Sequence, residues 1–198
     1  KAFHHNKLTH IQIPNSVTYI CSYAFNNNKL TNIELSKYIT YIGAYAFSNN
    51  KLTNDLHIPN SVTYIGNSAF QNNKLINVQI PDSVTTVCDS TFNQNELTNL
   101  IIPNSVTKIH RNAFEKNKLT NIEIPDSVTY IGDDAFKLNK LVSVILPNSI
   151  TIIRRGTFFN NELTNVVIPK FVIEISNFAF FDNKLTHIEI PNSVISII

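Results

Sequence analysis

Leucine recurs at a regular spacing along the whole chain, at Leu8, Leu30, Leu52, Leu75, Leu97, Leu119, Leu141, Leu163 and Leu185. Successive leucines are 22 residues apart, except for the step from Leu52 to Leu75, which is 23 residues long. A fixed period of this length indicates stacked repeats, because one such unit is too small to bury its own apolar face and buries it against its neighbours. We number each unit from its leucine, position 1, to position 22.

The unit that begins at Leu119 shows the pattern within one repeat. Apolar residues that would point inward alternate with polar residues in 119–124 and again in 128–131. This alternation predicts two short strands. Pro125 and Asp126 predict the turn between them. A glycine and two aspartates before Ala135 and Phe136 predict one helical turn. At the inter-strand spacing of about 4.8 Å, nine coils would make a rod about 40 Å long.

Two other residue types recur once per unit and predict the inside of the stack. Phenylalanine at position 18 indicates a buried spine, in which each ring contributes about 2 to 3 kcal/mol by burial. Asparagine at position 21 lies where the chain turns back, and there it most simply pairs with backbone groups and stacks on its neighbour. The phenylalanines are Phe3, Phe25, Phe47, Phe70, Phe92, Phe114, Phe136, Phe158 and Phe180. The asparagines are Asn6, Asn28, Asn50, Asn73, Asn95, Asn117, Asn139, Asn161 and Asn183.

Composition and length predict one repeat array over residues 1–198. The chain is 43% hydrophobic and 15% charged, which is enough to build a core. The array divides into a partial unit at 1–7, eight full units over 8–184 and a partial unit at 185–198, and it starts inside a repeat without methionine, so we expect a fragment of a longer protein. A net charge of +2 is too small to indicate nucleic-acid binding. No apolar run is long enough to predict membrane insertion.

The residue types that carry chemistry give no catalytic, cofactor or metal site. Cys21 and Cys88 both fall at position 14, three coils and roughly 14 Å apart, which is too far for a disulfide bond. His4, His5 and His10 cluster without a cysteine or carboxylate at metal-ligand spacing. The serines belong to a repeat column, whereas a catalytic triad needs one serine unlike the others. We therefore expect no enzyme activity.

Recognition is expected at outward positions that vary between units. Position 5 carries mostly polar residues but becomes apolar later in the chain, and position 3 on the same face is mostly asparagine. Adaptable polar groups around an apolar patch are typical of interfaces. Two neighbouring phenylalanines at position 19 form a second candidate, although compensating core packing would explain them equally well. The candidate partner-binding residues are Ile101, Glu123, Ile145, Val167, Asn99, Asn121, Asn165, Phe159 and Phe181.

Three further columns allow a surface role as an alternative to a structural one. Position 22 holds lysine in most units, and the stripe could attract acidic glycans, although a solvated, solubilising edge is favoured. The lysines are Lys7, Lys29, Lys51, Lys74, Lys118, Lys140 and Lys184, interrupted by Glu96 and Glu162. Threonine recurs at positions 2 and 11, which leaves ice binding as a minor alternative, because threonine is also simply favourable in strands.

These residues resemble the leucine-rich repeats, whose core Leu-x-x-Leu-x-Leu stands here as Leu119-x-x-Ile122-x-Ile124. The resemblance is stronger to the BspA-like (Treponema pallidum-type) subclass, which carries Ile-Pro-x-Ser-Val-Thr-x-Ile-Gly-x-x-Ala-Phe; that string is nearly complete in residues 58–70 and 124–136. The chain departs from the subclass in its unit length, usually 23 residues, and in having asparagine where the subclass has cysteine.

The resemblance implies a repeat solenoid, a right-handed leucine-rich-repeat superhelix with a parallel β-sheet on one face and short strands and short helical or 3-10 turns on the other. It also implies a secreted or cell-surface protein that acts in adhesion without catalysis. The leading hypothesis is a module that binds a protein or glycan partner through its sheet face, as a monomer or with weak end-to-end association. The alternative is a structural spacer or self-assembling element, because uncapped solenoid ends expose strand edges.

Overall fold

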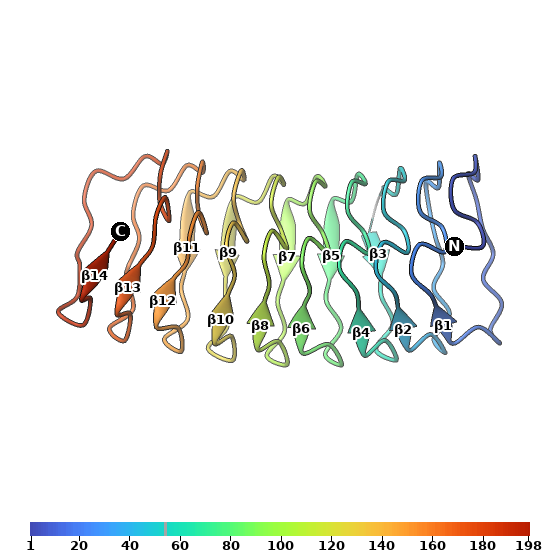
Figure 1. Cartoon of the computed structure of the whole chain (residues 1–198), viewed down its shortest axis with the longest axis horizontal. Coiled ribbons are helices and arrows are strands. Elements are labelled where there is room, and N and C mark those ends of the chain that lie inside the picture. Colours follow the sequence, from blue (N-terminus) through green and yellow to red (C-terminus); the bar gives the residue numbers. More distant parts are fainter. Residues whose placement is uncertain (54) are drawn as a thin grey trace.

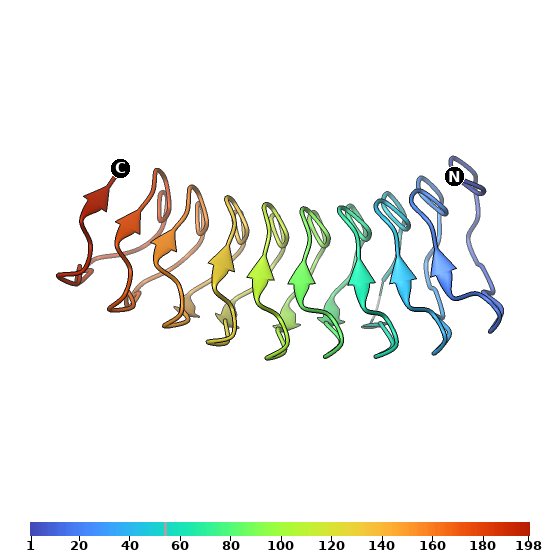
Figure 2. The same ribbon diagram turned by 60° about the horizontal axis from the view of Figure 1, so that its bottom comes forward.

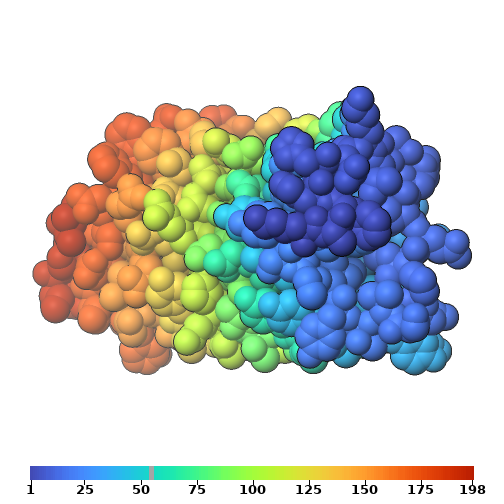
Figure 3. Space-filling view, turned by 45° about the vertical axis from the view of Figure 1, so that its right-hand side comes forward, coloured from blue at the N-terminus to red at the C-terminus, as the bar shows by residue number. Residues whose placement is uncertain are grey.

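The repeat units form successive coils of one solenoid, which runs from the N-terminal to the C-terminal end along the long axis of the molecule (Figure 1). The computed structural model describes residues 1–53 and 55–198. The coils lie side by side in a gently bowed stack (Figure 2), and in the space-filling view they follow one another closely along the body (Figure 3). The expected solenoid architecture is confirmed.

Each coil contributes to one or both of two sets of parallel strands. The first set has three residues per strand, at positions 3 to 5: β3 (Asp55–His57), β5 (Asn77–Gln79), β7 (Asn99–Ile101), β9 (Asn121–Glu123) and β11 (Ser143–Ile145). The second set has two residues per strand, at positions 12 and 13: β1 (Tyr19–Ile20), β2 (Tyr41–Ile42), β4 (Tyr64–Ile65), β6 (Thr86–Val87), β8 (Lys108–Ile109), β10 (Tyr130–Ile131), β12 (Ile152–Ile153), β13 (Glu174–Ile175) and β14 (Ser196–Ile197).

Strand pairing keeps equivalent positions of neighbouring coils opposite one another. The first set forms the sheets β3-β5-β7 and β11-β9, and the second set forms β1-β2-β4, β10-β8-β6 and β12-β13-β14. Within β5 and β7, for example, Val78 lies opposite Leu100 and Gln79 opposite Ile101. This register places every residue type on its own column along the stack, so that the repeat in sequence becomes a repeat in space.

The core occupies the space between the two sets of strands. In the unit that begins at Leu119, the residues at positions 1, 4, 6, 10 and 13 are buried, with exposed fractions of 5% or less: Leu119, Ile122, Ile124, Val128 and Ile131. Because each side chain of this set packs against its counterparts in the coils on both sides, the core is continuous along the array.

The phenylalanines at position 18 form a continuous ring stack inside the solenoid. Neighbouring rings have centroids 5.4 to 5.8 Å apart and interplanar angles of 16° or less, from Phe3 to Phe180. The rings from Phe47 to Phe158 are buried, whereas Phe3 is 49% exposed at the N-terminal end. The stack therefore joins all the coils through one apolar column.

The asparagines at position 21 form a second column that pairs with backbone groups. The Asn139 amide nitrogen donates to the carbonyl oxygens of Phe114 and Phe136, each at 3.0 Å, and its amide oxygen accepts from the Leu119 N–H at 3.2 Å. Phe114 belongs to the preceding unit, so one side chain connects two coils. The same bonds recur from Asn28 to Asn183.

The expected helical turn is wrong, because the described residues contain no helical segment between the strands and form tight turns instead. Two positions of each turn, 16 and 20, have positive φ; in the unit of Leu119 they are Asp134 and Leu138, both at 57°. A left-handed residue cannot continue a right-handed helix. Backbone bonds to the next coil hold these residues in place: Asp134 N–H donates to Arg155 at 2.9 Å, and Leu138 N–H donates to Phe159 at 2.9 Å.

The longer step between Leu52 and Leu75 is absorbed before β3. The Thr53 N–H donates to the Thr31 carbonyl at 3.1 Å, so position 2 is still in register, and His57 already lies opposite Gln79 at position 5. The extra residue therefore falls between Thr53 and β3, where Asn54 lies outside the described residues. His57 therefore keeps its place in the column of position 5.

Candidate functional site

The outward side chains at positions 3 and 5, in the first set of strands and at the same positions of the other coils, form a continuous surface, which we call the sheet face. Position 4 of these strands points inward, so the residues on either side of it must point outward. The apolar members Ile101, Ile145 and Val167 are 64%, 61% and 75% exposed. Glu123 lies between two of them, directly opposite Ile145 in the register. Three exposed branched side chains therefore share a surface that is polar elsewhere.

Hydrogen bonds between neighbouring coils connect the polar residues of the sheet face. The Asn99 amide nitrogen donates to the Asn77 amide oxygen at 2.9 Å, and the Ser143 hydroxyl donates to the Asn121 amide oxygen at 3.3 Å. Asn165 is exposed on the same column further along. These bonds fix the orientation of several amides before a partner arrives, which lowers the entropic cost of using them in binding.

Among the described residues the sheet face contains three shallow hollows, and two of them include an apolar residue of position 5. One, of about 390 Å³, is lined by residues of the last coils: Asn165, Val166, Val167, Ile168, His187, Glu189, Ile190 and Pro191. The other, of about 340 Å³, lies over β3, β5 and β7 and is lined by Leu56, His57, Asn77, Val78, Gln79, Asn99 and Ile101. Each of these two hollows combines an apolar side chain of position 5 with neighbouring amides and a histidine, so each can receive a partner's side chain or a sugar ring.

A cluster of three phenylalanines forms a separate exposed apolar patch, which we call the aromatic cluster. The Phe159 and Phe181 rings stack with centroids 5.1 Å apart, and Phe178 meets Phe181 edge to face at 5.6 Å. Phe178 and Phe181 are 54% and 55% exposed. The Lys137 ammonium lies 5.0 Å from the centre of the Phe159 ring. The sequence pattern predicts that Phe159 and Phe181 are neighbours. The edge-to-face contact of Phe178 completes the cluster.

The structure separates the two candidate surfaces. The aromatic cluster belongs to the turns at positions 16 to 19, whereas the sheet face belongs to positions 3 and 5, and Figure 2 shows these turns and the strands β3 to β11 on different sides of the coils. Ile101, Glu123, Ile145 and Val167 share one surface with Asn99, Asn121 and Asn165, and Phe159 and Phe181 do not belong to it. One partner of modest size would therefore contact one surface or the other.

Ile76 and Val142 are exposed apolar residues that the sequence analysis did not select. They are 42% and 44% exposed and occupy position 2, next to the sheet face. The signal was present in the sequence, because threonine fills this position in most other units.

The recurrent threonines of position 11 have structural partners. The hydroxyls of Thr40, Thr63, Thr107 and Thr129 donate to the carbonyl oxygen of the threonine in the preceding coil, at 3.2 to 3.3 Å. These bonds run along the stack and occupy the hydroxyl hydrogens. The column is therefore explained by its contacts within the solenoid.

The two thiols lie in different surroundings. Cys21 is exposed, whereas Cys88 is partly buried beside Tyr64, and both are free. Burial raises the pKa of the Cys88 thiol above its ordinary value, and a hydrogen bond with Tyr64 opposes this shift only in part. Partial burial also raises the pKa of Tyr64. A thiol with a raised pKa is a weak nucleophile, so this pair resembles a packing contact.

Metal-binding groups and membrane-spanning helices were sought throughout the described residues. No three histidine, cysteine, aspartate or glutamate side chains among residues 1–53 and 55–198 are grouped so that they could hold a metal ion. Within the same residues, no helix is long and apolar enough to cross a membrane.

Solved structures with a related fold come from bacteria. A leucine rich cell surface protein from Faecalibacterium prausnitzii A2-165 is 23% identical with a TM-score of 0.52, over 94% of this chain and 74% of that protein. A leucine-rich repeat protein from Bacteroides ovatus ATCC 8483 is 22% identical with a TM-score of 0.50, over 93% of this chain and 73% of that protein. The pneumococcal vaccine antigen PcpA is 20% identical with a TM-score of 0.51, over 91% of this chain but half of that protein. At this level of identity the likeness concerns the fold.

A family comparison covers the chain from end to end. No curated protein matches it. The family described as the BspA type leucine rich repeat region (six copies) matches this chain twice, over residues 1–120 and over residues 88–198. The two matches overlap and together include every coil described above, with the leucine, phenylalanine and asparagine columns. The chain belongs to the BspA type leucine-rich repeat family.

Proposed function

We propose that this chain is a non-catalytic interaction module of a cell-surface or secreted protein, and that it binds a protein or glycan partner through the sheet face. The observation that carries the proposal is the exposure of Ile101, Ile145 and Val167 on an otherwise polar, ordered surface. The bacterial proteins with a related fold include one described as a cell surface protein and one described as a vaccine antigen, which supports the proposed location.

Exposed apolar side chains of this kind favour a contact role over a structural one. Each branched residue at position 5 leaves more than half of its surface in water, so it contributes little to the core. In other coils of the array the same position holds glutamine or glutamate, which shows that the fold does not need an apolar residue there. A partner that covered the three residues would gain their burial energy without distorting the solenoid.

Substitution of the three apolar residues tests the sheet face. The chain is applied to immobilised extracellular matrix proteins and to a glycan array, and each ligand that binds is measured again with the Ile101→Asp, Ile145→Asp, Val167→Asp variant. We expect its affinity to fall at least about tenfold, because each substitution replaces apolar contact with a charge that must be desolvated. Because Ile145→Asp places a carboxylate directly opposite Glu123, folding is checked with glutamine at the three positions, the residue of other coils, and this variant should keep the midpoint of thermal unfolding nearly unchanged.

A matched variant separates the sheet face from apolar surface in general. Tyr19→Asp, Ile173→Asp and Ile195→Asp change three exposed apolar residues at positions 11 and 12, away from the sheet face. This variant should bind as the unaltered chain does. Equal loss in both variants, or loss only after Phe178→Ser and Phe181→Ser, would refute the sheet face as the contact surface; in the second case the aromatic cluster would take its place.

A further inference from the structure

Charge is distributed unevenly along the solenoid. Residues 1–80 contain six lysines and two carboxylates, whereas residues 81–198 contain ten lysines and arginines and twelve carboxylates. The small net charge of the chain therefore conceals a basic N-terminal part and a slightly acidic remainder. Three histidines near the N-terminus add to the basic character when they are protonated.

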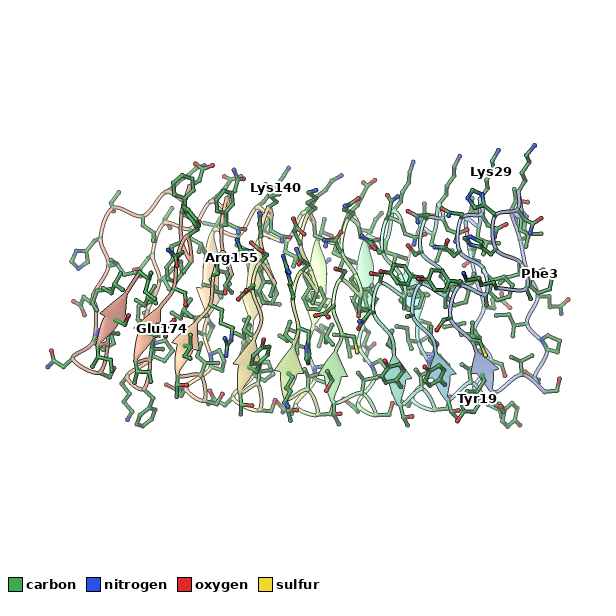
Figure 4. The ribbon with its side chains drawn as sticks, viewed as in Figure 1. Phe3, Tyr19, Lys29, Lys140, Arg155 and Glu174 are labelled. Carbon is green, nitrogen blue, oxygen red and sulfur yellow. The ribbon has the colours of Figure 1, made fainter. Side chains whose placement is uncertain are left out.

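Four lysines of the N-terminal part lie on consecutive coils at the same edge. Lys7, Lys29, Lys51 and Lys74 all occupy position 22 and are all exposed. Figure 4 shows Lys29 and Lys140 extending away from the solenoid on this edge. At about 4.8 Å per coil, the four lysines span roughly 14 Å along the stack. We call this row the basic edge.

The basic edge differs from the rest of the lysine column in its lack of compensation. Further along, Lys118 pairs with Glu96 and Lys184 pairs with Glu162, both at 2.7 Å, so that among the described residues of that part of the column only Lys140 stands without an ion pair. Among the described residues, Lys7, Lys29 and Lys51 have no carboxylate within ion-pair distance. Lys74 borders Glu96, whose pKa is lowered first by its hydrogen bond to Lys118 and only weakly by Lys74. Like charges on successive coils repel one another, so a polyanion would relieve an existing repulsion.

The backbone beneath these lysines is held rigidly. The N–H groups of Lys29, Lys51 and Lys74 donate, at 2.8, 2.9 and 2.8 Å, to the carbonyl oxygen of the leucine that opens the same unit, one turn of the solenoid earlier. The residue before each of them is the buried asparagine of position 21, which is fixed by its own hydrogen bonds. The spacing of the charges is therefore fixed by the fold, and only the lysine side chains lose freedom on binding.

The residues that flank the basic edge indicate the kind of polyanion. Position 2 carries the exposed hydroxyls of Thr9 and Thr31, and position 20 carries the amides of Asn49 and Asn72, which hydrogen-bond to each other at 2.7 Å. Hydroxyls and amides suit the hydroxyl, sulfate and carboxylate groups of sugars. Single-stranded nucleic acid would instead need aromatic platforms for its bases, and beside Lys29, Lys51 and Lys74 these two columns carry none.

We propose that the basic edge binds a linear anionic polysaccharide, which lies along the stack with its sulfate or carboxylate groups on successive lysines. The contact is electrostatic and is independent of the sheet face, so the chain has two binding surfaces with different ligands. Because the edge is straight and repetitive, the polysaccharide is recognised by its charge spacing over several coils rather than by one sugar unit.

The test uses variants with the same charge change at the same repeat position. A heparin hexasaccharide is titrated into the unaltered chain, into the Lys29→Gln, Lys51→Gln, Lys74→Gln variant, and into the Lys118→Gln, Lys140→Gln, Lys184→Gln variant. The first variant should lose at least about tenfold in affinity and the second less than about threefold, because the first removes three lysines without ion pairs and the second removes only one, Lys140, together with two paired ones. Raising NaCl from about 50 to about 200 mM should lower the affinity of the unaltered chain for the hexasaccharide at least about tenfold, because binding releases counterions.

Other probes identify the chemistry and decide the remaining outcomes. Hyaluronan, which carries carboxylates alone, and heparin, which also carries sulfates, distinguish the two anionic groups, and neutral dextran should not bind. Glu96→Lys joins the basic edge to Lys118 and should tighten heparin binding. Equal losses in the two triple variants, binding no stronger than that of dextran, or tighter binding of an oligothymidine of equal charge would each overturn the proposal. The sheet-face variant should bind heparin as the unaltered chain does, so the two proposals fail separately.

Discussion

Asn117 makes four hydrogen bonds with one side chain, all of them to backbone groups. Its amide nitrogen donates to Phe92 at 3.0 Å, Phe114 at 3.1 Å and Glu115 at 3.4 Å, and its amide oxygen accepts from the Leu97 N–H at 3.0 Å. The side chain is 7% exposed, so water cannot easily replace these partners. Position 21 is uniform because these backbone groups present the same donors and acceptors in every coil, and an amide satisfies both kinds.

Removal of this amide should destabilise the fold strongly. Asn117→Ala leaves the Leu97 N–H unpaired in the core and removes one of the two amide donors to the Phe92 carbonyl, and we expect a loss of about 1 to 3 kcal/mol in the free energy of unfolding. The measurement is urea-induced unfolding followed by circular dichroism. Asn121→Ala, an exposed amide four residues away, serves as the control and should cost less than about 0.5 kcal/mol. Similar costs for the two variants would contradict the assigned role.

At the scale of the element, the turn between the second and the first strands is set by two left-handed residues. Asparagine or aspartate fills position 20 in many coils, as at Asn72 with φ of 54°, because these side chains tolerate the left-handed region. Lys116 occupies the same position with φ of 57°, and its side chain is exposed. The lysine therefore adopts an unfavourable backbone conformation that the coil-to-coil hydrogen bonds impose.

Replacement of this lysine by the residue of the other coils should stabilise the protein. We expect Lys116→Asn to raise the free energy of unfolding by about 0.5 to 1 kcal/mol, since asparagine tolerates a positive φ at lower cost. The midpoint of urea-induced unfolding gives the change. Lys118→Asn provides the comparison, because it makes the same substitution at a position without positive φ and breaks the ion pair with Glu96. A gain of the same size in Lys118→Asn would show that backbone strain is not the cause.

The strands and the turn at Pro125 and Asp126 could be predicted from the sequence, and the turn around positions 14 to 20 could not. Positions such as Ile122 and Val128 recur with the period of the repeat, and burial follows directly from that recurrence. The residues around Asp134 carry a local helix-start signal, but the bond from its N–H to the next coil outweighs it. The sheet face was predictable because strand residues alternate, whereas the hollow beside Gln79 and the edge-to-face contact of Phe178 depend on how neighbouring side chains lean together.

At the scale of the whole molecule, each coil interacts with its two neighbours and with little else. Phe114 stacks between Phe92 and Phe136 at 5.8 and 5.5 Å, and Asn117 connects its own unit to the preceding one. A solenoid of this kind behaves as a one-dimensional array, in which stability is approximately the sum of unit and interface contributions. Its length is therefore adjustable in steps of one unit.

Deletion of one unit tests this modularity. Removal of residues 97–118 joins Glu96 to Leu119, so position 22 is again followed by position 1, and Phe92 can stack on Phe136 as it did on Phe114. Glu96 then lies one coil from Lys140, which replaces its lost partner Lys118. We expect a folded protein with an unchanged shape of the circular dichroism spectrum and a maximum dimension in X-ray scattering shorter by about 5 Å.

Deletion of half a unit should prevent cooperative folding, because it puts the repeat columns out of register. Removal of residues 97–107 joins Glu96 to Lys108, which places strand β8 where a leucine and a first-set strand should begin. Phenylalanine and asparagine columns would then face strand residues across the break, and the buried amide of Asn117 would lose its partners. We expect the protein that lacks residues 97–107 to lose cooperative unfolding and the protein that lacks residues 97–118 to retain it. If the half-unit deletion were as stable as the full-unit deletion, the columns would not be what holds the coils together.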